Sequence, residues 1–202
     1  PGSCSDLPDA RNEVEGIARL FPAGAEVRIG ALADETFAKS GKLSEFRVVH
    51  IAAHALLHEE PALALARSPG EDGTLTASEA SALPALGADL LALSTCGPDG
   101  AIPEGTPWEA GLPAAFLSNG ASSVLSPLWP VTDAATARLM VRFYEGIARG
   151  IPRAEALRQA RLALLDGEVS RPSERVPGPS KPSDEWSHPR HWAAFVLEGA
   201  PR

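Results

Sequence analysis

Apolar residues recur at helical spacing along much of the chain, and capping residues mark where these stretches begin. Pro8 suits a first helical turn, and the apolar positions that follow it end at Pro22-Ala23-Gly24. Asp34 and Thr76 can each cap a short helix, and Thr132 or Asp133 can cap a long one. The pattern predicts helices over 8–21, 34–38, the residues after Thr76, 106–119 with its capping box Thr106-Pro107-Trp108-Glu109, 132–150 and 152–166.

Runs of apolar and β-branched residues lie between these stretches and predict strands over 25–30, 46–54, 88–95, 121–128 and 191–199. The apolar run within 88–95 indicates a strand that is buried on both faces. Strands that alternate with helices indicate an α/β fold, with a central mostly parallel sheet and helices on both faces. The polar segment 168–187 is expected to be a mobile loop.

Length, composition and charge narrow the class of protein. A chain of 202 residues, 44% of them hydrophobic, is expected to form one globular domain over 1–202. The formal net charge of −8 gives no reason to expect nucleic acid or an anionic membrane surface as a partner. The longest apolar runs are also too short and too interrupted to cross a bilayer.

The cysteine count and the chain start indicate a cytoplasmic protein. Cys4 and Cys96 are the only cysteines, too few for a disulfide framework, so we expect a reducing compartment. Residues 1–20 lack the basic start and apolar segment of a signal peptide. Because the chain begins with Pro1 rather than Met, we expect it to be the end of a longer protein.

Two reactive side chains follow predicted strands at positions where the strands end. Cys96 comes at the end of 88–95, and His54 at the end of 46–54. In open α/β sheets the ligand crevice lies beyond the carboxyl ends of the strands, so a Cys/His dyad is possible there. The imidazole would then activate the thiol. The alternative is that both residues belong to the core, since free cysteine is among the most buried residue types.

Metal and cofactor chemistry has little support. His50, His54 and His58 are spaced four residues apart and would share one face of a helix, as zinc ligands can. The surrounding run is β-like and has no helix cap, so no metal is expected. The sequence also contains no Gly-rich phosphate loop and no Gly-x-Ser-x-Gly elbow, so we expect no cofactor.

Four segments, taken in order, resemble the successive signatures of the CHAT domain, a bacterial relative of caspases and separases: 49-VHIAAHA-55, 90-LLALSTCGPDG-100, 114-AAFLSNGASSVLSPLWPVTD-133 and 188-HPRHWAAFVLEG-199. The resemblance implies a caspase-like three-layer sandwich and cysteine endopeptidase activity on a protein substrate. It also implies an N-terminal repeat or regulatory region in the full-length protein. The alternative function is a catalytically inactive pseudoprotease that acts as a regulatory interaction domain.

The family pattern assigns roles to individual residues. His54 matches the family histidine and Cys96 the nucleophile, which implies that the backbone N–H groups of Cys96 and Ala55 hold the oxyanion. The family carries glycine where this chain has Ala55, and Gly97-Pro98-Asp99 also departs from the usual pattern. A left-handed backbone at Ala55 would cost about 1 kcal/mol or more.

Asp133 looks like the acidic residue that, in separases, lies near the pocket for a basic side chain. As a helix cap it would need no other role. Trp108 lies in a segment that resembles separases, but a tryptophan beside a capping box is more often a packing residue. Trp192 and Phe195 are most simply packing residues of a last strand, and Glu59-Glu60 is expected to be a solvated turn.

Overall fold

The computed structural model describes residues 8–57, 59–96, 108–167 and 186–200. It divides the chain into two compact units. The sheet unit comprises Arg28–Pro130 and Val196–Ala200, and the helical unit comprises Pro1–Val27, Val131–Phe195 and Pro201–Arg202. No helix among the described residues is long and apolar enough to cross a membrane.

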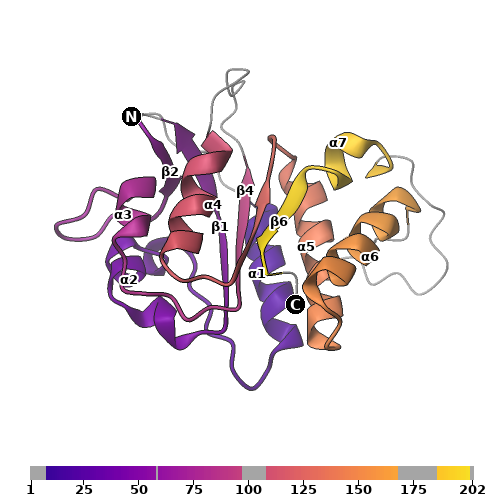
Figure 1. The fold of residues 1–202 in the computed structure, drawn as a ribbon, viewed down its shortest axis with the longest axis horizontal. Helices are drawn as coiled ribbons and strands as arrows, with labels where there is room; N and C mark the ends of the chain where they lie inside the picture. The colour runs from indigo at the N-terminus through magenta and orange to yellow at the C-terminus, as the bar shows by residue number, and fades with distance from the viewer. Residues whose placement is uncertain (1–7, 58, 97–107, 168–185, 201–202) are drawn as a thin grey trace. The chain divides into compact units, whose positions relative to one another are not determined.

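A six-stranded sheet organises the sheet unit, with strand order β3-β2-β1-β4-β5-β6 (Figure 1). The strands β1, β4 and β5 are parallel, whereas β1, β2 and β3 pair antiparallel. The sheet is therefore mixed. The α/β class is confirmed, and a parallel arrangement holds for the three central strands but not at the β2 and β3 edge. The strands are β1 Val48–Leu57, β2 Pro61–Ala64, β3 Thr74–Thr76, β4 Leu90–Cys96, β5 Ser123–Pro127 and β6 Phe195–Gly199.

Short helices of the sheet unit pack on its strands around one apolar cluster. Leu63, Leu75, Leu91, Phe116 and Val124 are all completely buried in this cluster. The α4 helix contacts β2, β5 and α3. The helical elements of this unit are η1 Gly30–Leu32, α2 Glu35–Lys39, η2 Lys42–Glu45, α3 Ala77–Ser81 and α4 Trp108–Ser118.

Two of the predicted caps are present. The Asp34 carboxylate accepts the Phe37 N–H at 2.7 Å and starts α2. Thr76 and Glu79 form a capping box at the start of α3, in which Thr76 N–H donates to Glu79 at 2.9 Å. The predicted box at Thr106 lies outside the described residues.

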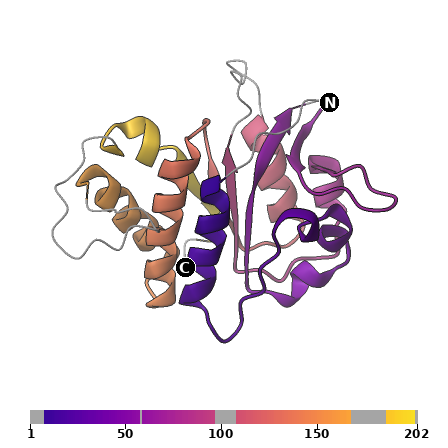
Figure 2. The ribbon, with the colours of Figure 1, turned by 180° about the vertical axis from the view of Figure 1, so that it is seen from behind.

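The helical unit is built on α5, which packs against both α1 and α6 (Figure 2). Phe143 and Tyr144 of α5 are completely buried, and their rings meet edge to face. Close packing of α5 on α6 depends on Gly146, where an added Cβ would lie 2.8 Å from the Ala156 Cβ. The helices of this unit are α1 Pro8–Leu20, α5 Asp133–Ala148, α6 Arg153–Leu165 and α7 Pro189–Trp192.

Two predictions about strands are wrong, and two strands were not predicted. No strand forms over 25–30, because these residues are mostly exposed and no neighbouring strand pairs with them. The short strands β2 and β3 were not predicted. The strand predicted over 191–199 begins only at Phe195, because His188 caps α7 and Pro189 occupies its first turn. Most of the predicted loop 168–187 lies outside the described residues.

Candidate functional site

His54 and Cys96 are register partners in the parallel ladder between β1 and β4. The ladder begins at Val48↔Leu90 and ends at His54↔Cys96. Neighbouring strands lie about 4.8 Å apart, so partners in register are adjacent positions of the sheet. The structure therefore brings together the two residues that the sequence singled out for catalysis.

The register of this pair is held from the opposite ends of the two strands. Asp89, directly before β4, donates its N–H to the Arg47 carbonyl at 2.7 Å. Its carboxylate accepts from Arg47 Nε at 2.6 Å. A slip by one residue would turn every side chain of a strand to the other face of the sheet, so these contacts help to define the partner of His54.

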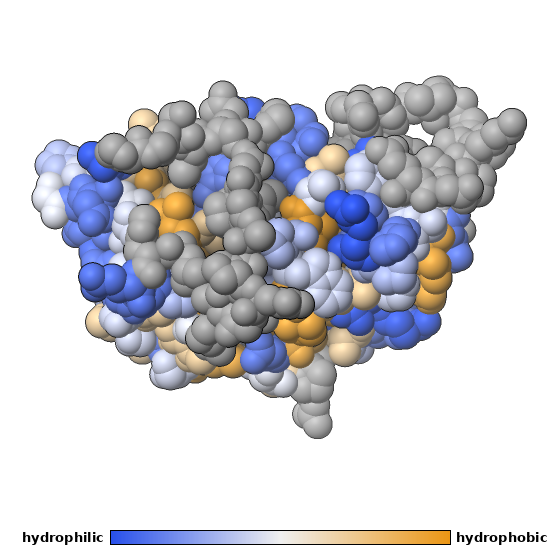
Figure 3. Space-filling view, turned by 90° about the horizontal axis from the view of Figure 1, so that it is seen from above, coloured by the Kyte–Doolittle hydropathy of each residue, from blue (hydrophilic) through white to orange (hydrophobic). Residues whose placement is uncertain are grey.

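The strand β1 changes partners immediately after His54. Ala55, Leu56 and Leu57 pair antiparallel with β2, in the register Ala55↔Leu63. His54 is thus the last residue of the parallel ladder rather than the last residue of its strand. Cys96 ends β4. The pair lies at the carboxyl edge of the central strands, where open α/β sheets bind ligands. Figure 3, which views the molecule from the side of this edge, shows hydrophobic and hydrophilic residues intermixed.

The surroundings of the pair hold it firmly. His54 is half-buried, and the strand positions before Cys96 are buried, with Ser94 exposed to 3% and Thr95 to 1%. Ala53, before the histidine, is also buried. A residue carried by a buried strand is held more rigidly than one carried by a loop.

Ala55 adopts the backbone of a regular strand. No residue other than glycine has a positive φ among the described residues, so the conformational cost considered for an alanine at this position does not arise. Its side chain is 1% exposed and belongs to the apolar cluster. The backbone N–H that the family resemblance assigns to the oxyanion is therefore carried by a residue anchored in the core.

The alternative zinc site required a helix that does not form. His50 and His54 both lie on β1, where four residues span about 13 Å. Two imidazoles that far apart along a strand cannot share one ion. His58 lies outside the described residues.

Asp133 lies in the helical unit, at the first position of α5. Its Oδ2 accepts the backbone N–H of Asp9 at 2.8 Å, so the carboxylate satisfies a donor in the first turn of α1. Thr132, the N-cap residue, makes no side-chain capping bond. The hydrogen bond of Asp133 to Asp9 thus links the start of α5 to the start of α1.

The structure gives no functional role to the other residues considered from the sequence. Trp108 begins α4, but its side chain lies outside the description. Glu59 is exposed, as a solvated turn predicts, whereas Glu60 accepts both the N–H and the hydroxyl of Ser78, at 2.9 and 2.7 Å. Hydrogen bonds from Ser78 lower the pKa of Glu60.

Phe195 is fully buried, as a packing residue should be. Trp192 lies on α7 rather than on a strand, and its indole N–H donates to the Ser187 carbonyl at 2.9 Å.

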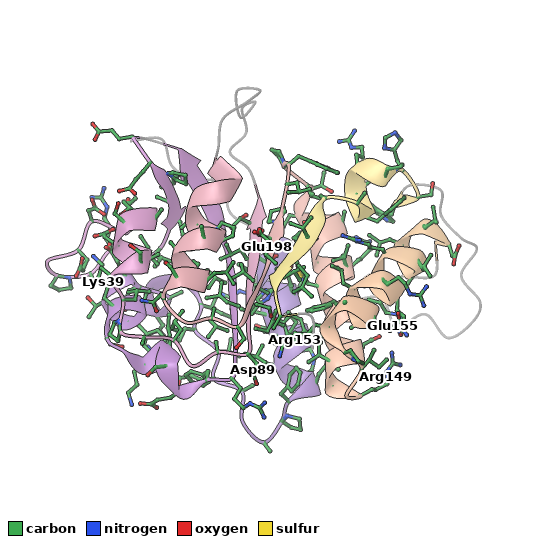
Figure 4. The ribbon with its side chains drawn as sticks, in the orientation of Figure 1. Lys39, Asp89, Arg149, Arg153, Glu155 and Glu198 are labelled. Carbon is green, nitrogen blue, oxygen red and sulfur yellow. The ribbon has the colours of Figure 1, made fainter. Side chains whose placement is uncertain are left out.

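An ion cluster that the sequence analysis missed surrounds Lys39 on α2 (Figure 4). Its Nζ lies 2.6 Å from a carboxylate oxygen of Glu35 and 2.7 Å from those of Glu71 and Glu79. Burial lowers the pKa of Lys39, but hydrogen bonds to the three carboxylates outweigh burial and raise it overall. Glu35 also accepts the N–H groups of Gly73 and Thr74. The available signal was the four-residue spacing of Glu35, on the predicted helix 34–38, and Lys39, directly after it.

The three carboxylates around Lys39 have oxygens within 4.8 Å of one another, a spacing that would also suit a metal ion. The ammonium group already supplies the positive charge that these carboxylates require. We therefore assign the cluster a structural role, which is to fasten the segment before β3 to α2.

The sequence matches the CHAT domain over residues 1–200. The chain belongs to the CHAT family. CHAT domains are caspase-like, so family membership agrees with the Cys/His pair at the sheet edge. The resemblance inferred from the four signatures is confirmed.

Two curated relatives are similar in sequence to part of this CHAT chain. Tetratricopeptide repeat protein 28 of Homo sapiens is 32% identical over 89 residues, which are 44% of this chain and 3% of the relative. Tetratricopeptide repeat protein 28 of Mus musculus is 30% identical over 89 residues, again 44% of this chain and 3% of the relative. The similarity therefore spans only a small part of either relative.

Proposed function

We propose that this CHAT domain is a cysteine endopeptidase that cleaves a protein substrate through a Cys96/His54 dyad. The observation that supports the proposal is the register pair His54↔Cys96, which closes the parallel ladder at the carboxyl edge of the sheet. Nucleophilic catalysis by cysteine needs a base within reach of the thiol. Adjacent backbone positions on two neighbouring strands support such a pairing of base and thiol.

In the proposed mechanism, His54 takes the proton of the Cys96 thiol as the sulfur attacks the scissile carbonyl carbon. The carbonyl oxygen becomes an oxyanion, which accepts hydrogen bonds from the backbone N–H groups of Cys96 and Ala55. His54 then protonates the leaving amine as the C–N bond breaks and an acyl-enzyme remains. Water, activated by His54, hydrolyses the thioester and restores the thiol. No metal or cofactor takes part.

We further propose a caspase-like three-layer sandwich for the domain, in which helices cover both faces of the sheet. An N-terminal repeat or regulatory region is proposed for the full-length protein. The name of the two relatives, which refers to tetratricopeptide repeats, supports such a region. We propose the cytoplasm as the site of action, with no nucleic acid or membrane as a direct partner, in keeping with the net charge of −8.

Asp133 is proposed to favour Arg or Lys at P1, the residue immediately before the scissile bond. The proposal rests on the resemblance of 128-LWPVTD-133 to the separase segment and on the charge of the residue. A carboxylate binds a guanidinium through charge-assisted hydrogen bonds.

The second candidate is a pseudoprotease that binds partners without cleaving them. Ala55 in place of the family glycine favours it, because Ala55 is locked in a regular strand opposite Leu63. If an active site needs a freely oriented N–H at this position, the strand pairing removes that freedom. The two candidates share the fold and differ only in chemistry.

Covalent labelling distinguishes the candidates. The chain is treated with a peptidyl acyloxymethyl ketone that carries Arg at P1, and the adduct is located by mass spectrometry of proteolytic fragments. The endopeptidase proposal expects one adduct, on Cys96, that is lost in His54→Ala. Cys4 serves as the internal control for simple thiol reactivity. Equal labelling of both cysteines, or none, favours the pseudoprotease.

A further inference from the structure

The strand β5 lies beside β4 on the side opposite to β1. The two strands are parallel, and Leu91 and Ala92 of β4 pair with Val124 and Leu125 of β5. Each β5 residue therefore has a residue number 33 higher than its partner on β4. Continued to the end of β5, this register brings Pro127 level with Ser94. Trp129 follows two residues later, in the bend that leaves the carboxyl end of β5. The three central strands thus end, in spatial order, near His54, at Cys96 and just before Trp129.

The backbone around Trp129 is well anchored although its side chain is exposed. Ser126 and Pro127, the last residues of β5, are buried, and Pro130 restricts Trp129 to an extended backbone. The Trp129 residue is 37% exposed. Four other large apolar residues among those described are exposed: Val27 on a loop, Leu32 on η1, and Leu162 and Leu165 on α6. None of these four follows a central parallel strand.

The order of the strands also orients a bound substrate, and this step rests on the proposed function. His54 must lie near the leaving amine in order to protonate it, so the amine side of the scissile bond points toward β1. The acyl side, which carries the P1 residue, then extends from Cys96 in the opposite direction. That direction leads to the end of β5 and to Trp129.

We propose that the Trp129 indole is the stacking surface for the P1 side chain and that it selects the planar guanidinium of Arg over the ammonium of Lys. Tryptophan offers the strongest cation–π surface among the side chains. Arg stacks flat on an aromatic ring as well as carrying charge, whereas Lys presents a compact, strongly hydrated charge. The chain stacks its own arginines in this way: Arg28 Cζ lies 3.6 Å from the Phe37 ring centroid and Arg138 Cζ 4.7 Å from that of Trp186.

Binding measured without cleavage tests the subsite separately from the chemistry. Peptides that are identical except for Arg or Lys at P1 are titrated into Cys96→Ala by isothermal calorimetry. The same peptides are titrated into Cys96→Ala combined with Trp129→Ala, Trp129→Phe or the control Leu32→Ala. We expect Cys96→Ala to prefer the Arg peptide by about fivefold, Trp129→Ala to remove the preference, and Trp129→Phe to keep most of it. Leu32→Ala should bind like the parent.

Each result decides one proposal. An Arg preference that survives Trp129→Ala, an equal loss for both peptides, or no binding of either peptide to Cys96→Ala overturns the subsite. Trp129→Phe keeps the test valid if Trp129→Ala fails to fold, because loss of preference in a folded Phe variant also contradicts a stacking role. If the wild-type chain cleaves neither peptide but Cys96→Ala binds Arg in a Trp129-dependent way, the subsite stands and the endopeptidase proposal fails.

Discussion

His54 and Cys96 are the last register partners of the parallel ladder between β1 and β4. The ladder places on two adjacent strands two residues that lie 42 positions apart in the sequence. Because β1 then pairs with β2 and β4 ends, the pair lies where the sheet opens to ligands. The same backbone pairing that stabilises the core therefore aligns the proposed catalytic residues.

Replacement of the nucleophile should abolish cleavage. Cys96→Ala is expected to lower the rate on a verified peptide substrate by at least about a thousandfold, because the Cys96 sulfur forms the acyl-enzyme in the proposed mechanism. His54→Ala should also inactivate, with little change in the melting temperature, since His54 is only half-buried. Cys4→Ala is the control and should cleave normally. Turnover by Cys96→Ala at the wild-type rate would show that the nucleophile is misassigned.

Zinc should play no part in the activity. The strand geometry separates His50 from His54 by about 13 Å, so the spacing that suggested a metal does not produce a site. Elemental analysis of the purified chain is expected to find no stoichiometric zinc, and a chelator should leave cleavage unchanged. One bound zinc per chain would contradict the strand-based interpretation of these histidines.

Removal of the charge of Asp133 should weaken the selection of a basic P1 residue. Asp133→Asn keeps an oxygen that can accept the Asp9 N–H, so the melting temperature should change little. Cleavage after Arg should fall by about tenfold, equivalent to about 1.4 kcal/mol of transition-state binding. Peptide-library profiling measures the change. An unaltered Arg preference would leave Asp133 with its structural role alone.

Asp133→Ala separates that structural role from specificity. It removes the acceptor for the first turn of α1, so hydrogen exchange should accelerate in residues 9–12, which begin this helix. Asp133→Asn should protect these amides nearly as well as the wild type. Thr132→Ala is the matched control, because Thr132 makes no side-chain capping bond. Equal exchange in all four proteins would contradict an anchoring role for the Asp133 carboxylate.

Lys39 should contribute strongly to stability at neutral pH. Lys39→Met leaves three neighbouring carboxylates without their common cation, and we expect a loss of about 1 to 3 kcal/mol in the free energy of unfolding. Lys42→Met is the control, since its pair with Glu45 is exposed and should change the stability by less than about 0.5 kcal/mol. Chemical denaturation at pH 7 measures both. Equal effects would show that the cluster is no stronger than a surface pair.

The effect of Lys39→Met should shrink as the pH falls. The hydrogen bond from Lys39 is the main cause of the lowered pKa of Glu79. A carboxyl group with a lowered native pKa stabilises the fold above its unfolded pKa, about 4.3, and loses this contribution as the pH falls through the native value. In Lys39→Met the carboxylates repel one another, and protonation relieves that repulsion. Melting temperatures of the two proteins, followed from pH 7 to pH 3, should therefore converge mainly below about pH 4.3. Parallel curves would contradict the assigned coupling.

Local patterns were sufficient for much of the fold. The helices α1, α5 and α6 begin and end close to their predicted limits, because apolar spacing and Pro or Gly signals act within a few residues. Asp34 and Thr76 were identified as caps because a cap also bonds within one turn. The ordered signatures predicted the CHAT family and, through it, the candidate roles of His54 and Cys96.

The sequence by itself thus determined the helices, the α/β class, the family and the two residues proposed for catalysis. Only the tertiary structure decided which strands formed: residues 25–30 have a strand-like pattern but no partner, whereas the short β2 and β3 exist because β1 continues past His54 and pairs with β2. The same holds for the Lys39 cluster, whose carboxylates come from three separate segments. The physical reason is that a helix satisfies its hydrogen bonds within its own segment, whereas a strand or an ion cluster depends on groups that are distant in the chain.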